Sequence, residues 1–221
     1  MEYRWNFASV WENWQALAVG VSGTLRLFIV CAVAGLSFGL VVAFGRRARR
    51  TPVRWLATAF VEFFRNTPVL VQILWFYFAL PMLMPVEISP FIAAALAISL
   101  NSAAYSAEIY RGGMQSIEPG QTEAARALGM GAFQTLRRIV LPQAIRRVLP
   151  ALTNRTVEIF KMTTLASVVA YAELVQQGRL IASLNFNPLE VYTVIGALFM
   201  ILLYPIIRAT YALERRLARS D

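Results

Sequence analysis

Four ionisable side chains lie inside or beside apolar stretches and are the residues that could carry chemistry: Glu62, Glu108, Glu158 and Lys161. Carboxylates and an amine can transfer protons when they are held near a reacting group. The chain has no histidine, one cysteine (Cys31), no acids at metal-ligand spacing and no glycine-rich phosphate loop. We therefore expect no cofactor or metal in this chain and no enzyme activity, with a membrane-embedded enzyme kept as an alternative.

The elements that position these residues are long apolar segments. Of 221 residues, 58% are hydrophobic, and the mean hydropathy is +0.56. At ~1.5 Å per residue, an uncharged helix of about 20 residues crosses the hydrocarbon layer. We predict an all-helical membrane protein that forms one transmembrane domain over residues 1–221. Its five transmembrane helices are expected roughly at 20–45, 56–82, 88–111, 148–172 and 190–211.

The distribution of arginine predicts how the chain crosses the membrane. Three segments hold 15 of the 21 basic residues: the loop after the first span, the loop 112–147 with its border, and the tail. Only Arg4, Arg26 and Arg179 lie near the other side. Because basic loops stay in the cytoplasm, we expect the N-terminus outside, the C-terminus inside and loop 112–147 in the cytoplasm. The net charge of +9 is thus explained without nucleic acid. The clustered residues are Arg46, Arg47, Arg49, Arg50, Arg54, Arg111, Arg126, Arg137, Arg138, Arg146, Arg147, Arg208, Arg215, Arg216 and Arg219.

The cytoplasmic loop contains signals for two short helices. Pro119 suits a helix start, since its missing N–H would be unpaired there. Gly129 can end that helix in a left-handed conformation. A second helix is expected over 131–140, and Pro142 is expected to stop it. The small residues of the first helix would let it lie close to another protein, although an amphipathic helix on the membrane surface is the alternative.

The spacing of this loop resembles a known element. Glu-Ala-Ala, three residues, Gly, nine residues and Ile-x-Leu-Pro is the pattern of the EAA loop in membrane subunits of ATP-binding-cassette importers. It is matched here by Glu123, Ala124, Ala125, Gly129, Ile139, Leu141 and Pro142. Three more stretches resemble the polar amino-acid branch of that family, which includes the HisMQ-like permeases: GVSGTL at 20–25, EFFRNTPVLVQ at 62–72 and YSAEIYRGGMQSIEPGQTE at 105–123.

This resemblance implies the fold and the partners. It implies a type I importer permease in the bacterial inner membrane, with a coupling helix at Glu123, Ala124, Ala125 and Gly129 that docks on an ATPase. Two ATPase subunits would bind ATP and Mg²⁺, a second permease subunit (identical or related) would complete the path, and a periplasmic binding protein would deliver substrate. A passive channel is the remaining alternative from another class.

The fourth predicted span carries the candidate substrate path. Arg155, Glu158 and Lys161 are three residues apart, so they lie on neighbouring positions of one helical face and can pair. Charged side chains inside a membrane face protein or water, so this face either lines the path or only joins helices. The candidate path residues are Asn101, Glu158, Lys161, Met162, Thr163 and Thr164.

The segment KMTTLASV also resembles the family's Lys-Asp-Thr-Ser-Leu stretch, with Met162 where many relatives have Asp. The missing acid favours an acidic or neutral amino acid, such as glutamate, aspartate or glutamine, as the substrate. A basic amino acid or an opine is the alternative within the same family.

A last set of candidates lies in the second span. Glu62 and Arg65 are one turn apart and are expected to form an ion pair within the helix. Pro68 is expected to kink this helix, and such breaks can act as gates in transporters or be structural only.

Overall fold

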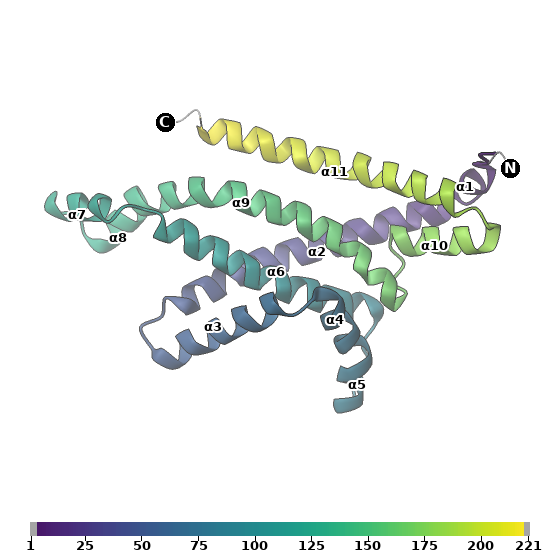
Figure 1. Ribbon diagram of the computed structural model, residues 1–221. Helices are drawn as coiled ribbons and strands as arrows, with labels where there is room; N and C mark the ends of the chain where they lie inside the picture. Colours follow the sequence, from purple (N-terminus) through teal and green to yellow (C-terminus); the bar gives the residue numbers. More distant parts are fainter. Residues whose placement is uncertain (1–3, 219–221) are drawn as a thin grey trace. The chain divides into compact units, whose positions relative to one another are not determined.

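The computed structural model describes residues 4–218, without the side chains of Thr210 and of residues 213–218. The predicted tail residues Arg215, Arg216 and Arg219 therefore lie outside the described side chains. Within the described residues the chain is helical and contains no strand (Figure 1). The α-helices are α1 (Ala8–Glu12), α2 (Trp14–Arg46), α3 (Thr51–Asn66), α4 (Val69–Leu74), α5 (Leu80–Leu83), α6 (Pro90–Gln115), α7 (Pro119–Ala127), α8 (Ala132–Thr135), α9 (Leu141–Met162), α10 (Leu174–Asn185) and α11 (Pro188–Ala218).

The predicted all-helical membrane class is confirmed. In the described part of the chain, three helical stretches are long and apolar enough to cross a membrane: Trp14–Arg46, Pro90–Gln115 and Pro188–Ala209. The pair Thr51–Asn66 and Val69–Leu83 adds a fourth span if it is counted as one broken helix. The fifth predicted span, 148–172, corresponds to the later part of α9 and the 3₁₀ segment η3 (Thr163–Val169), and five crossings stay a prediction.

Two π-helical segments each end two residues before a proline. The segment η1 (Trp75–Ala79) precedes Pro81, and η2 (Leu136–Val140) precedes Pro142. A proline inside an α-helix lacks the N–H and clashes with the carbonyl four residues earlier. A wider π turn displaces that carbonyl and lets the helix continue. The predicted stop at Pro142 is therefore wrong, since the chain stays helical from α8 through η2 into α9.

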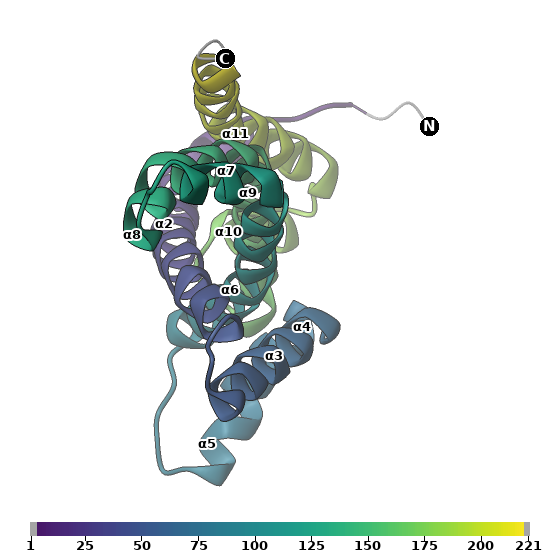
Figure 2. The same ribbon diagram turned by 90° about the vertical axis from the view of Figure 1, so that its left-hand side faces the viewer.

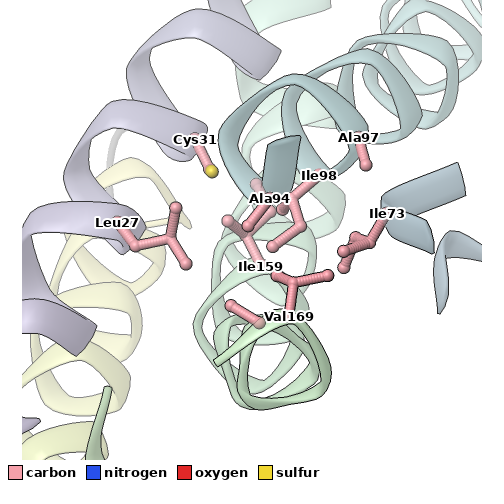
Figure 3. Packing of buried hydrophobic residues seen from close by; sticks show 9 residues of the cluster. Leu27, Cys31, Ile73, Ala94, Ala97, Ile98, Ile159 and Val169 are labelled. Carbon is pink, nitrogen blue, oxygen red and sulfur yellow. The ribbon is translucent and has the colours of Figure 1, made fainter. Parts of the chain in front are cut away.

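The chain divides into two compact units. The first consists of Met1–Val33, Thr67–Ser99 and Val157–Ile207. Its main core joins α2, α4, α6, α9 and η3 around small and branched residues (Figure 3). Two of these core residues, Ala94 and Ala97, are alanines of α6, and small side chains allow helices in a membrane to approach closely. The residues shown are Leu27, Cys31, Ile73, Ala94, Ala97, Ile98, Ile159 and Val169, with Ala166 completing the cluster.

The GVSGT stretch of α2 provides the closest backbone approach in this first unit. A Cβ added to Gly23 would lie 2.2 Å from the carbonyl oxygen of Ala172. Thr24 Oγ1 accepts the N–H of Leu174 at 3.1 Å, and the Tyr171 hydroxyl donates to the Gly23 carbonyl at 3.1 Å. The resemblance at 20–25 thus reflects a packing site between α2 and the start of α10.

Glu173 caps α10 at this packing site. Its carboxylate accepts the N–H groups of Val175 and Gln176 at 2.9 and 2.7 Å, which satisfies two donors that have no partner in the helix. The side chain is fully buried. Burial raises the pKa of Glu173 to about 7, because desolvation of the charged form outweighs the two N–H bonds.

The second unit consists of Ala34–Asn66, Leu100–Thr156 and Arg208–Asp221. Val61 of α3 packs against Val42 and Ala43 of α2 and Ala107 of α6. Figures 1 and 2 both show α7 and α8 beside each other, near the start of α9. This second unit holds the segment with the Glu-Ala-Ala pattern.

We predict that Gly23→Ala destabilises the chain by about 1–3 kcal/mol, because the added methyl meets backbone and not a flexible side chain. The measurement is the unfolding transition of the purified protein in detergent. Gly196→Ala is the matched control: it lies within α11, and nothing approaches its Cβ position within 4 Å. Equal transitions for Gly23→Ala and Gly196→Ala would contradict the close approach.

Candidate coupling segment and substrate path

The segment with the Glu-Ala-Ala pattern begins and ends as its sequence predicts. Pro119 occupies the first turn of α7. Gly129 has a φ of 77°, so it is in the left-handed region that favours glycine. Its N–H donates to the Arg126 carbonyl at 2.9 Å, and the Met130 N–H donates to the Ala125 carbonyl at 3.0 Å. This pair of bonds is a Schellman motif, which closes the helix and turns the chain toward α8.

The two faces of the segment differ in exposure. Ala125 is buried, whereas Glu123, Ala124 and Gly129 are exposed. Two large apolar side chains of the segment are uncovered: Leu128 is 82% exposed, and Phe133 is 74% exposed. Further along, Ile139 is half-buried, while Leu141 and Pro142 are exposed. Contiguous apolar side chains at a surface are typical of a site that another protein covers.

Polar contacts attach the segment to the helices on either side. Arg147 of α9 donates to the Ser116 carbonyl at the end of α6. Gln143 of α9 donates through Nε2 to Oε1 of Gln121 in α7 at 3.5 Å. These contacts join the beginning of α9 to α7 and to the turn before it.

All candidate path residues except Asn101, which is on α6, lie where α9 changes into η3. Glu158 and Lys161 are exposed on α9. Met162 is half-buried against the core cluster. Thr163 is buried and donates to the Phe160 carbonyl at 2.7 Å, and Thr164 donates to the Lys161 carbonyl at 2.8 Å. Both hydroxyls thus donate to backbone carbonyls at the point where the α-helix changes into the 3₁₀ helix.

The fourth predicted span is therefore not one continuous α-helix. From Thr163 to Val169 the backbone is 3₁₀, and it ends at Ala170 with a φ of 56°. Membrane proteins tolerate irregular backbone where it is buried in protein or lines a cavity, and broken helices are frequent at transport sites. The exposed Lys161 lies within one turn of this change and the exposed Glu158 within two turns, which is consistent with a path, and their role stays a prediction.

Arg155 is fully buried in a polar cluster inside the second unit. Its Nη2 donates to Asn101 Oδ1 at 2.8 Å and to Ser102 Oγ at 3.2 Å. The guanidinium also lies 4.4 Å from the centre of the Tyr105 ring. Sequence reasoning missed Ser102 and Tyr105. Tyr105 lies four residues after Asn101 and three after Ser102, so it shares a helical face with each, and this spacing is the signal that would have found them.

Asn101 and Tyr105 also cap the end of α3. Asn101 Nδ2 donates to the Phe64 carbonyl at 2.7 Å, and the Tyr105 hydroxyl donates to the Arg65 carbonyl at 3.4 Å. These carbonyls belong to the last turn before the predicted break at Pro68, which the structure confirms. Both polar ends of the Asn101 side chain are therefore engaged within the protein, and its contact with substrate stays a prediction.

The charged residues at the end of α3 pair differently from the prediction. Glu62 Oε2 accepts from Asn66 Nδ2 at 3.1 Å, and the described ion pairs contain none between Glu62 and Arg65. Arg65 instead lies 3.9 Å from Glu108, which also pairs with Arg46 and Arg111. The helical spacing is compatible with the predicted pair, but in the structure Arg65 pairs with Glu108 of α6, as the other two arginines do.

Comparisons with known proteins cover nearly the whole chain. Residues 35–219 match the family model described as "Binding-protein-dependent transport system inner membrane component". The glutamine transport system permease protein GlnP of Escherichia coli (strain K12) is 37% identical over 218 residues, which are 98% of this chain and 99% of that protein. The arginine transport system permease protein ArtQ of Bacillus subtilis (strain 168) is 33% identical over 91% of this chain and 92% of its own.

A solved structure is similar over the same extent. The structure described as an amino acid ABC transporter with histidines superposes with a TM-score of 0.90 at 33% identity. The match covers 97% of this chain and 100% of that one. The expected permease fold is therefore confirmed.

We predict that Arg155→Ala lowers the free energy of unfolding by about 1–3 kcal/mol, because it leaves Asn101 and Ser102 buried without their donor. Arg137→Ala removes an exposed arginine and should stay within about 0.5 kcal/mol of the parent protein. Unfolding in detergent is followed by far-ultraviolet circular dichroism. An Arg155→Ala protein as stable as the Arg137→Ala control would exclude a structural role for the buried cluster.

Proposed function

We propose that this chain, which belongs to the family of binding-protein-dependent transport system inner membrane components, is the permease subunit of an ATP-driven importer for a polar amino acid. The observation that carries the proposal is the full-length similarity to an amino-acid permease. It is supported by the exposed apolar side chains of the segment with the Glu-Ala-Ala pattern, which we call the coupling segment. The chain is a component of the inner membrane. As a permease subunit it is not an enzyme, because ATP hydrolysis belongs to separate subunits.

The coupling segment is where we expect an ATPase subunit to bind. Leu128 and Phe133 would be buried in a groove of the ATPase, with Glu123 and Ala124 at its border. The ATPases would bind ATP and Mg²⁺, and their closure would push on α7. Since α8, η2 and α9 follow one another without interruption, the push would be carried along α9 toward Lys161.

The substrate is proposed to pass the exposed face of α9 at its change into η3. An amino acid carries a carboxylate and an ammonium group, and Lys161 and Glu158 offer one partner for each. Met162 adds no second acid, so we favour glutamate, aspartate or glutamine. The similarity to an arginine permease keeps a basic amino acid as the second candidate.

The remaining partners are proposed by type. A second permease subunit, either a copy of this chain or a relative, would form the other wall of the path. A periplasmic binding protein would deliver the substrate from outside, and two ATPases would bind on the cytoplasmic side.

The coupling role predicts a specific effect at Gly129. Gly129→Val forces a β-branched residue into a φ of 77°, which only glycine adopts without strain, so it should displace α7 from its docking angle. We expect reconstituted complexes to lose at least about tenfold in substrate-stimulated ATPase activity and uptake, the equivalent of about 1.4 kcal/mol in coupling.

Gly131→Val is the matched control for this experiment. Gly131 has a φ of −67° and a ψ of 159°, a conformation that valine accepts, and nothing lies within 4 Å of its Cβ position. This variant should couple normally. If both variants transported at the parental rate, α7 would not be the coupling element.

The substrate prediction is tested by uptake into vesicles that contain the complete transporter and its binding protein. Glutamine, glutamate and aspartate should compete with the transported amino acid more strongly than arginine does. Lys161→Met should reduce uptake of the preferred substrate several-fold while the complex remains assembled. A preference for arginine would overturn the assignment and leave the basic amino acid as the substrate.

A further inference from the structure

Four exposed arginines lie in the turn between α2 and α3 and in the first turn of α3. Arg47, Arg49, Arg50 and Arg54 are all exposed, and none has an ion pair among the side chains that the structure describes. There is no acidic residue between Glu12 and Glu62, so the neighbouring sequence offers no carboxylate. We call these four residues the arginine cluster. Its charge requires an anionic partner from outside the chain or exposure to water.

The backbone holds this cluster in a short turn. The Arg47 N–H donates to the Phe44 carbonyl at 3.0 Å and the Ala48 N–H to the Gly45 carbonyl at 3.1 Å, which ends α2. α3 begins at Thr51, and the Arg54 N–H donates to the Arg50 carbonyl at 3.2 Å. The four guanidinium groups therefore start from a defined turn and the first helical turn after it.

Exposed apolar side chains border the arginine cluster on both helices. On α2, Val41 and Phe44 are 62% and 60% exposed. On α3, Trp55 is 68% exposed and Leu56 is 61% exposed, while the opposite face of α3 buries Val61. Tryptophan is enriched at the level of lipid headgroups, where its ring meets both apolar and polar surroundings.

We propose that the arginine cluster binds the headgroups of anionic phospholipids, with Trp55 at the interface and the apolar border against the acyl chains. Guanidinium groups bind phosphate through paired N–H donors. A zwitterionic headgroup carries its own ammonium, so a net negative lipid is attracted more strongly. An acidic protein surface would neutralise the charge of the cluster, but it would leave the exposed apolar side chains beside the cluster without an apolar partner.

The orientation of the chain in the membrane does not by itself require this arrangement. It requires that basic residues lie on one side, not that they gather without carboxylates beside an exposed tryptophan. Arg46, Arg65 and Arg111 show the contrast, because they lie around Glu108. The arginine cluster, by contrast, has no carboxylate partner among the described side chains.

The test measures which lipid lies next to Trp55. Trp5, Trp11, Trp14 and Trp75 are replaced with phenylalanine in the full-length chain, so that Trp55 is the only tryptophan and is excited selectively. It is reconstituted into vesicles of phosphatidylcholine with a minor fraction of phosphatidylglycerol, and brominated chains are placed on one lipid or the other at equal mole fraction. No ATPase or substrate is needed, so the result is independent of the proposed transport function.

We expect brominated phosphatidylglycerol to reach an effective concentration around Trp55 about fivefold above that of brominated phosphatidylcholine, equivalent to about 1 kcal/mol. Replacing all four arginines of the cluster with glutamine should abolish this preference while phosphatidylcholine still quenches. Replacing them with lysine should preserve it in part, and high salt should weaken it. Inorganic phosphate should leave it unchanged, whereas displacement by phosphate would show a site for free anions and overturn the proposal.

If the protein with all four arginines replaced does not insert into the membrane, a double variant provides the same test. Arg47→Gln with Arg49→Gln should reduce the preference, and Arg137→Gln with Arg138→Gln, which removes the same charge from exposed positions elsewhere, should not. Equal quenching by the two lipids in the parent chain would overturn the proposal and leave the charge a role in orientation only. Absence of quenching by either lipid would also overturn it, since protein would then cover Trp55.

Discussion

Hydrocarbon offers no hydrogen bonds to a peptide group, and this constraint accounts for the polar residues inside an apolar chain. At two interruptions, a side chain from another helix meets the exposed backbone. Asn101 and Tyr105 do this for the last carbonyls of α3, and Thr24 does it for the first N–H of α10. The breaks at Pro68 and Ala170 are thus possible because their polar backbone is satisfied within each unit.

Local rules predicted the elements whose conformation depends on a few residues. Pro119, Gly129 and Pro68 act through their own backbone geometry, so the start of α7, its left-handed end and the break after α3 could be read from the sequence. The all-helical class follows from apolar length. The Glu-Ala-Ala pattern gave the family, and the similarity of the whole chain to known permeases confirmed it.

Interactions between distant segments could not be predicted in this way. Helical spacing placed Glu62 beside Arg65 and made Pro142 a stop, but the true partner of Arg65 is on α6, and a π turn accommodates the proline. The cluster of Arg155 with Asn101 and Ser102 joins residues more than fifty positions apart. Such pairs depend on which helix faces cross, which a single sequence does not encode locally. Contact of residues 158–164 with substrate stays a prediction.

The π turn before Pro142 also fixes the rotational phase of everything that follows it. A π turn accommodates one residue more than an α turn, so the face of α9 that carries Arg155 is rotated by about 100° from where an unbroken α-helix would place it. Deleting one residue of 136–140 and restoring an α turn would keep this face in place, but it would return the clash between the proline and the carbonyl four residues before it. The length of this short stretch is thus tied to the proline that follows it.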